Sequence, residues 1–241
     1  MVPGGECAGF RLVGLLRSVG GVEIWKAVRR DGYPVALKLA AEGSAAAHRL
    51  AHETAALRLV ASSGTTVCEE VGSTDGFAYL ALDWCGGGSL KEELRRRTPT
   101  VVEIRRIAIQ VLHALQDLER AQVVHRDIKP SNLLLTDEGD VRLADFGVAL
   151  LPGEAPSRTR PVGTDGYMSP EQIACGSIDG RSDLYSLGRV LSDLLNGRPD
   201  VPAALGRFVA RLTERNPAFR PPTAAFARAE LLRLGEDGRY L

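Results

Sequence analysis

One eight-residue stretch limits what this chain can fold into more than any other, and it reads His125-Arg126-Asp127-Ile128-Lys129-Pro130-Ser131-Asn132. A valine pair precedes it and three leucines follow it, so we predict a loop held between two short apolar strands. In this loop a carboxylate can accept a hydroxyl proton, an ammonium can neutralise a phosphate, and an amide oxygen can hold a metal ion. Phosphoryl transfer needs these three groups close together.

A second carboxylate is expected at the same place. Asp145-Phe146-Gly147 comes directly after the strand-like run Val-Arg-Leu-Ala at 141–144 and lies C-terminal to Asn132. Carboxylate and amide oxygens are ligands that hard cations accept. Asn132 and Asp145 are therefore predicted to flank one site.

These motifs, with Ser169-Pro170-Glu171 behind them in the same order, resemble the eukaryotic-like (Hanks-type) serine/threonine protein kinases, most of all the compact bacterial ones. The resemblance covers about residues 10–234. It implies an α+β, bilobal protein-kinase fold, with a small β-rich N-lobe that carries one key helix and a larger, mainly α-helical C-lobe. We expect the N-lobe at about 10–82, the hinge at about 83–88 and the C-lobe at about 89–234.

The resemblance also implies the catalytic roles. Asp127 would orient the substrate hydroxyl and take its proton, and Lys129 would steady the transferring γ-phosphate. Asn132 and Asp145 would hold Mg²⁺, with Mn²⁺ as the alternative metal. Lys38, which ends a Val-Ala-Leu-Lys run, would bind the α and β phosphates of ATP.

Residues 44–60 are predicted to form a helix, because Leu50, Leu57 and Val60 give it an apolar stripe. Glu53 lies on that stripe, and a buried carboxylate needs a partner. Lys38 is the natural candidate, since the family has such a pair and its closure marks the active state. The alternative is an ordinary helix whose Glu53 points to solvent.

The adenine site is implied by the resemblance of the segment 80–85 to a kinase hinge. Leu82 would be the gatekeeper, and backbone groups near Asp83 and Cys85 would bind adenine. Further nucleotide contacts are expected from Val22, Ala36 and Leu134. The three glycines at 86–88 lie at this hinge and not between a strand and a phosphate-facing helix, so we assign them no phosphate.

The glycine-rich loop is where the sequence departs from the family pattern G-x-G-x-x-G-x-V. In the aligned stretch 17–24, the three signature positions hold Arg17, Val19 and Val22. Glycine lets backbone amides approach phosphates closely, whereas branched valines stiffen the backbone and crowd that approach. We therefore predict weaker or slower use of ATP, or an unusual lid, with Arg17 as a candidate compensating cation.

Residues 148–162 have the composition of an activation segment, with Ser157 and Thr159 set among arginines and prolines. Arg126 would pair with a phosphate on this segment. The alternative is a flexible basic loop that is never phosphorylated.

Three further contacts are implied by the resemblance. Thr164 would bridge the catalytic aspartate and lysine. Asp183, in the first turn of an apolar helix predicted from 180 to about 195, would accept backbone hydrogens of the catalytic loop. Arg220 would pair with Glu171 as scaffolding. Two closing helices are predicted at 203–213 and 223–234.

The balance of charged residues, the cysteines and the apolar runs limit the partners and the location that we expect for this chain. The 30 Lys and Arg residues balance the 30 Asp and Glu residues, so we expect no nucleic acid and no membrane surface as a partner. The 4 cysteines are scattered and indicate reduced thiols. No apolar run reaches membrane-spanning length and the first residues lack an apolar signal core, so a cytoplasmic location is expected.

The sequence thus predicts a non-specific serine/threonine protein kinase that phosphorylates protein substrates with ATP and phosphorylates itself through transient self-association. One alternative is a pseudokinase or weakly active nucleotide-binding scaffold, because the glycine-rich loop is degraded. Another is a small-molecule phosphotransferase on a related fold. The docking segment 163–171 argues against that one, because small-molecule relatives generally lack it.

Overall fold

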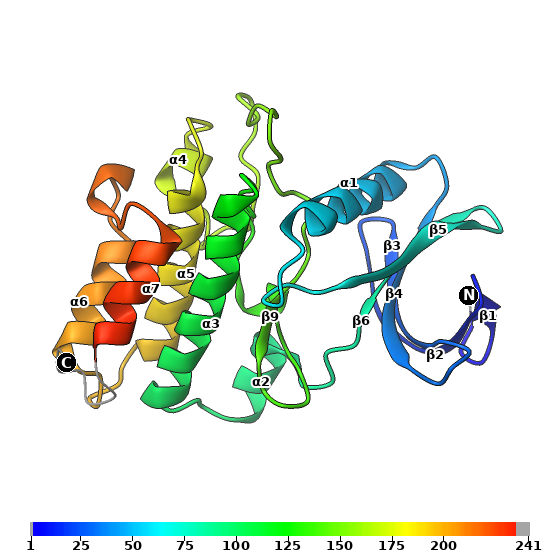
Figure 1. Ribbon diagram of the computed structural model, residues 1–241, viewed down its shortest axis with the longest axis horizontal. Helices are drawn as coiled ribbons and strands as arrows, with labels where there is room; N and C mark the ends of the chain where they lie inside the picture. Colours follow the sequence, from blue (N-terminus) through cyan, green and yellow to red (C-terminus); the bar gives the residue numbers. More distant parts are fainter. Residues whose placement is uncertain (1, 235–241) are drawn as a thin grey trace.

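The computed structural model describes residues 2–234, in which a curled sheet with one helix adjoins a mostly helical part (Figure 1). The sheet has six antiparallel strands in the order β1-β2-β3-β4-β6-β5. Its elements are β1 (Glu6–Cys7), β2 (Phe10–Val19), β3 (Val22–Val28), β4 (Pro34–Ala41), α1 (Ala45–Val60), β5 (Cys68–Thr74) and β6 (Phe77–Asp83).

The two faces of this sheet have different partners, because successive side chains of a strand point to opposite faces. Trp25, Leu37 and Leu39 lie on one face and close an apolar cluster with Phe10 and Leu12. The opposite face carries Lys38 together with Leu80 and Leu82, which join the main core of the molecule. The sheet therefore turns its lysine-bearing face toward α1 and the helical part.

Helix α1 begins and ends where the sequence predicts. The Ser44 hydroxyl accepts a hydrogen bond from the Ala47 N–H at 3.1 Å, which satisfies one of the free amides of the first turn. Ala61 ends the helix in a left-handed conformation with φ 42°, and its N–H donates to the Leu57 carbonyl. The predicted stripe of Leu50, Leu57 and Val60 is buried, which confirms this helix.

The C-terminal part begins with a small sheet in the order β7-β8-β9. Its strands are β7 (Gly88–Ser89), β8 (Leu133–Leu135) and β9 (Val141–Leu143), and its helices are α2 (Leu90–Arg96), α3 (Val101–Arg120), η1 (Pro130–Asn132), α4 (Pro170–Ile173), α5 (Gly180–Leu195), α6 (Ala203–Leu212), η2 (Pro217–Phe219) and α7 (Ala224–Arg233). Helices α3, α5, α6 and α7 lie side by side (Figure 1).

Helix α5 is the centre of this part, as its apolar sequence predicts. Leu184, Leu187 and Val190 are fully buried among the neighbouring helices. Gly188 lets α6 come close, since a Cβ at this position would lie 2.7 Å from the Leu212 Cβ. The two closing helices are confirmed as α6 and α7. Among residues 2–234, no helix has the length and apolar character that crossing a bilayer requires.

The connection between the two parts is narrow and depends on small residues. β6 ends at Asp83 and β7 starts at Gly88. A Cβ on Gly86 would lie 2.0 Å from a carboxylate oxygen of Asp137, and one on Gly87 would lie 2.8 Å from the Leu135 Cβ. The glycines therefore let this segment press against the loop after β8, which explains their presence without a phosphate.

Candidate active site

The loop 125–132, here called the catalytic loop, is anchored by the first turn of α5. The Asp183 carboxylate accepts hydrogen bonds from the backbone N–H groups of His125 at 2.7 Å and Arg126 at 2.9 Å. Burial raises the pKa of this carboxyl to about 7, although the two N–H donors act in the opposite direction. The predicted contact of Asp183 with the loop backbone is present.

His125 is a positioning residue that the sequence did not single out. It is fully buried, and its Nδ1 accepts the backbone N–H of Asp127 at 3.2 Å. Its Nε2 lies 3.1 Å from the Ala144 carbonyl, so the ring carries its proton on Nε2. Burial lowers the pKa of the imidazole, which keeps it neutral. The ring also meets Phe146 edge-on at 4.7 Å, and it thereby joins the catalytic loop to the segment that carries Asp145.

Asp127, Lys129 and Thr164 form a closed triangle of hydrogen bonds. Lys129 Nζ lies 2.7 Å from Asp127 Oδ2 and donates to Thr164 Oγ1 at 2.6 Å. The Thr164 hydroxyl in turn donates to Asp127 Oδ1 at 2.6 Å. The expected bridge of Thr164 to both catalytic groups is present, and both oxygens of the carboxylate are fixed by hydrogen bonds.

Asn132 is buried and its amide is oriented by the same aspartate. The amide nitrogen donates to the Asp127 carbonyl at 2.9 Å and to Asp127 Oδ2 at 3.1 Å. The amide oxygen keeps only a long 3.4 Å contact with the Ser131 hydroxyl. Backbone pairing brings the second metal-capable group near, because the Ala144 N–H donates to the Asn132 carbonyl at 2.9 Å and Asp145 is the next residue.

Asp145 presents its carboxylate at the cleft. Its side chain is 49% exposed and lies 3.9 Å from Lys38 Nζ. Burial would raise the pKa of the carboxyl, but the charges of Lys38 and Lys129 outweigh it and hold the pKa below its usual value. Its backbone has φ 68°, an unfavourable left-handed conformation for a residue other than glycine. An ionised acid is thus fixed beside the buried lysine.

This donor set fits a divalent cation. Asp145 is held in its charged form and the Asn132 oxygen is free of strong donors, which leaves two oxygen ligands on adjoining segments. Two protein oxygens are too few to enclose a cation, and no cluster of three His, Cys, Asp or Glu side chains that could do so exists within residues 2–234. Such a site suits an ion that also binds the phosphates of a nucleotide.

Lys38 and Glu53 form the buried pair that the helix stripe predicts. Lys38 Nζ lies 2.7 Å from each oxygen of the Glu53 carboxylate, and the two residues are 8% and 2% exposed. Burial lowers the pKa of the Lys38 ammonium, but the carboxylates of Glu53 and Asp145 outweigh this and raise it. The alternative of a solvent-facing Glu53 is wrong.

The tip of the expected glycine-rich loop is a two-residue hairpin. Gly20 and Gly21 have φ 57° and 79°, the left-handed pair that a tight turn of this twist requires. The Arg49 guanidinium of α1 donates to the Gly20 carbonyl. A Cβ on Gly21 would lie 3.3 Å from the Ala46 Cβ, also on α1. The sequence predicted weaker or slower use of ATP, or an unusual lid. In the structure, the tip of this hairpin is bonded to α1 through Arg49.

The pairing of β3 adds one side chain to those expected at the cleft. Directly paired residues share a face of the sheet, and Ile24 is the strand partner of both Lys38 and Arg17. Val22, expected to contact the nucleotide, lies on the same face two residues earlier and packs against the small apolar cluster of Ala40, Ala46, Ala47 and Leu50 beside α1. The sequence did not single out Ile24, because alternation alone does not distinguish it from Val22.

The other expected adenine contacts lie around the connection between the two parts. Ala36 is paired directly with Leu82, which is 3% exposed, so both face the same side. Cys85 is buried, and among residues 2–234 its backbone N–H has no acceptor. The Asp83 N–H, by contrast, donates to the Val67 carbonyl at 3.0 Å. Leu134 is half-buried on β8.

The segment after Asp145 is anchored without a phosphate. Arg126 Nε donates to the Val148 carbonyl at 2.6 Å, and its Nη2 donates to the Ala149 carbonyl at 3.1 Å. The guanidinium that was expected to pair with a phosphate therefore already has two backbone partners. Ser157 and Thr159 lie further along this segment.

The docking turn is fixed by two residues of α4. Arg220 is buried and makes the expected bidentate pair with Glu171, at 2.6 and 2.9 Å. Gln172, which the sequence did not single out, donates to the carbonyls of Arg126 at 2.8 Å and Val162 at 3.0 Å. It thus connects the docking turn to the catalytic loop.

Comparison with known proteins agrees with this geometry. The model of the protein kinase domain matches residues 19–218. The chain belongs to the protein kinase domain family. It is 36% identical over 192 residues to the serine/threonine-protein kinase PknL of Mycobacterium tuberculosis, which covers 66% of this chain and 47% of the relative. It is 32% identical over 227 residues to the serine/threonine-protein kinase pkn3 of Myxococcus xanthus, which covers 78% of this chain and 42% of the relative.

Membership of this family confirms the resemblance and the α+β fold that the sequence predicts. The family implies ATP and a divalent metal in general terms. The chain spans less than half the length of these two relatives, which extend beyond the matched region.

Proposed function

We propose that this chain is a protein kinase that transfers the γ-phosphoryl group of ATP to serine and threonine hydroxyls of protein substrates. The observation that carries the proposal is the simultaneous closure of the Lys38–Glu53 pair and the triangle of Asp127, Lys129 and Thr164. Residues 10–234 would form one kinase domain, with the N-lobe at about 10–82, the hinge at 83–88 and the C-lobe at 89–234.

In this proposal, Asp127 accepts a hydrogen bond from the substrate hydroxyl, orients it and takes its proton. Lys129 neutralises charge on the transferring phosphoryl group, and Lys38, held by Glu53, positions the phosphates. Bound Mg²⁺, or Mn²⁺ as the alternative, would neutralise phosphate charge, and Asn132 and Asp145 would hold it. The protein thus acts by positioning and by charge neutralisation.

The nucleotide base would lie against Ala36, Leu82 and Leu134, with the free N–H of Cys85 as a donor to it. Asp83 belongs to the same segment. Ile24 joins Val22 in this proposal, because both lie on the face of β3 that carries Lys38 on β4 and Ile24 is paired directly with Lys38. We place the reaction in the cytoplasm, where the 4 free cysteines would stay reduced.

A nucleotide-binding scaffold is the second candidate, because Arg17, Val19 and Val22 replace the glycines that let backbone amides approach phosphates closely. The complete set of catalytic groups favours the kinase. A small-molecule phosphotransferase is disfavoured, because the docking turn is fixed by Gln172 and by the Glu171–Arg220 pair.

The test is the transfer of labelled γ-phosphate from Mg-ATP to the protein itself and to a generic protein substrate, with Asp127→Asn and Lys38→Met as matched inactive variants. We expect label with the wild type and none with either variant. A rate that rises with protein concentration would indicate self-phosphorylation between two copies. Absence of label, together with a melting temperature raised by ATP, would replace the kinase with the scaffold.

A further inference from the structure

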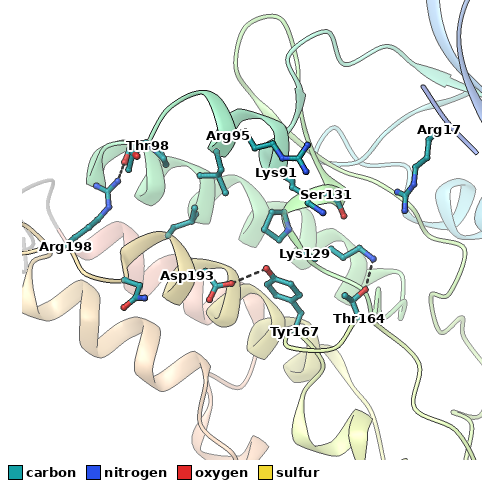
Figure 2. A pocket seen from close by; sticks show the side chains of 15 residues that line it. Arg17, Lys91, Arg95, Thr98, Lys129, Ser131, Thr164, Tyr167, Asp193 and Arg198 are labelled. Atoms are coloured by element: carbon teal, nitrogen blue, oxygen red, sulfur yellow. Dashed lines mark hydrogen bonds between the residues drawn. The ribbon is translucent and has the colours of Figure 1, made fainter. Parts of the chain in front are cut away.

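A pocket adjoins the catalytic triangle, with a cavity volume of about 720 Å³. Lys129 and Thr164 line it, and so do residues of α2, α5 and β2 (Figure 2). It therefore extends from the point where a hydroxyl would meet Asp127 along the surface of the C-terminal part. We call it the basic groove, because Arg17, Lys91, Arg95, Lys129 and Arg198 line it.

Basic side chains outnumber acidic side chains in the lining of this groove. Its one acidic lining residue within the described chain is Asp193, which accepts a hydrogen bond from the Tyr167 hydroxyl at 3.1 Å. Lys129 is engaged by Asp127, and Arg198 donates to the Pro99 carbonyl. Arg17, Lys91 and Arg95 make no salt bridge and no side-chain hydrogen bond within residues 2–234.

This excess is local, because the whole chain has a formal net charge of zero. Lys91 and Arg95 are four residues apart on α2, so they share one face of the helix, where like charges repel. Within the described residues, neither acid of the same helix forms a salt bridge with them. Glu92 caps the helix through Ser89, and Glu93 pairs with Arg97 at 2.5 Å. The helix dipole favours Arg95 in the last turn of α2 but disfavours Lys91 in the first turn, so helix stability does not explain Lys91.

Arg17 contributes from the other side. It lines the groove from β2, opposite Ile24 in the sheet. Cations from both parts of the molecule therefore face the same groove.

We propose that the basic groove selects protein substrates that carry anionic side chains close to the acceptor serine or threonine. This inference rests on the proposed kinase function and adds the substrate class to it. The carboxylates of Asp and Glu share the required chemistry with the phosphate of an already phosphorylated residue. A basic substrate segment would instead meet repulsion from Arg17, Lys91 and Arg95.

The test compares kcat/KM for peptides with one acceptor threonine flanked by Asp, by the isosteric Asn, by Lys or by phosphoserine. We expect the Asp peptide to exceed the Asn peptide by about tenfold, which is what two or three partly exposed ion pairs supply. In Lys91→Glu/Arg95→Glu, we expect the ratio to fall to about one or to invert. The control Arg207→Glu changes an exposed charge on α6, outside the groove, and we expect it to keep the ratio.

Equal kcat/KM for all four peptides, or a preference for Lys, would overturn the inference. A preference for the phosphoserine peptide alone would assign the groove to phosphorylated substrates. A preference for the Asp peptide would assign it to acidic sequences. If no peptide is phosphorylated, fluorescence anisotropy of the labelled Asp and Asn peptides with the wild-type protein separates the two proposals. Tighter, salt-sensitive binding of the Asp peptide then supports the groove while the kinase function fails, and equal binding overturns both.

Discussion

The buried His125 ring accepts the backbone N–H of Asp127 and donates to the Ala144 carbonyl. We expect His125→Phe to keep the aromatic contact with Phe146 but to leave the Asp127 N–H and the Ala144 carbonyl without their partner. Unpaired buried groups cost about 1–3 kcal/mol, so the free energy of unfolding in urea should fall by that amount. The kcat should fall as well, because Asp127 loses its support.

The control is His113→Phe, which replaces a half-exposed histidine on α3 and should change stability by no more than about 0.5 kcal/mol. A kcat for His125→Phe equal to that of the wild type would show that the ring serves packing only.

Glu171 gives a prediction with a definite pH dependence. Burial would raise the pKa of its carboxyl, but Arg220 and Ser182 outweigh it and lower the pKa below 4.5. Since the folded state binds this proton less tightly than the unfolded state, the group stabilises the fold above pH 4.5, and this contribution disappears as the pH falls below it. Glu171→Gln should therefore lose about 3–5 kcal/mol at pH 7, because buried Arg220 stays unpaired, and less at pH 4.

Urea unfolding at both pH values measures this difference, with Glu230→Gln as the control. Glu230 pairs with the half-exposed Arg211, so Glu230→Gln should lower the free energy of unfolding by about 1 kcal/mol or less. An equal loss for the two variants at pH 7 would contradict the role assigned to the buried pair.

Sequence reasoning worked best for residues that neighbour one another in the chain. The catalytic loop and Asp145 are contiguous motifs, so their residue types alone predicted their chemistry. Glu53 was predicted because helical spacing places it on a buried stripe. Gln172 acts on backbone carbonyls distant in sequence, and His125 joins Asp127 to Ala144, which lies 19 residues after the histidine; residue spacing does not reveal these contacts. Ile24 was not singled out because alternation places it on the same face of β3 as Val22, and only the pairing of Ile24 with Lys38 distinguishes the two.

At the scale of elements, the β2–β3 hairpin is expected to depend on its two glycines. In Gly20→Ala/Gly21→Ala, both positions keep a positive φ that costs about 1 kcal/mol or more each, and the new Cβ of residue 21 presses on Ala46. We expect a lower melting temperature and a higher KM for ATP. Gly14→Ala is the matched control, since a Cβ there meets nothing within 4 Å. An unchanged KM in the double variant would separate the hairpin tip from nucleotide binding.

The segment after Asp145 is expected to work without phosphorylation. Because Arg126 is already bonded to the Val148 and Ala149 carbonyls, Ser157→Ala/Thr159→Ala should keep most of the kcat for an added substrate. Arg126→Ala removes both bonds and should lower kcat by about tenfold or more. Initial rates on dephosphorylated protein measure both effects. A double variant as inactive as Arg126→Ala would show that a phosphate is required after all.

At the scale of the whole molecule, ligand binding should stabilise the fold through both of its parts. With Mg-ATP at about 100 times its Kd, the melting temperature should rise by about 5–10 °C. Chelation of the metal should remove part of this rise. In Asp145→Asn the metal-dependent part should be lost, because the neutral amide is a poorer cation ligand. Asp193→Asn, a change outside the cation site, should retain it, and an unaltered rise in Asp145→Asn would exclude that residue as a metal ligand.

The tie between Arg49 and the Gly20 carbonyl also has a mechanical consequence. The β2–β3 hairpin is bonded to α1, and α1 is bonded to β4 through Glu53 and Lys38, so we expect these elements to move as one rigid body. Opening of the hairpin alone would have to break the Arg49 contact. In the proposed kinase, we therefore expect nucleotide to enter and leave as the N-terminal sheet and α1 tilt together about the glycines at 86–88, and we expect the rate of this motion to limit turnover.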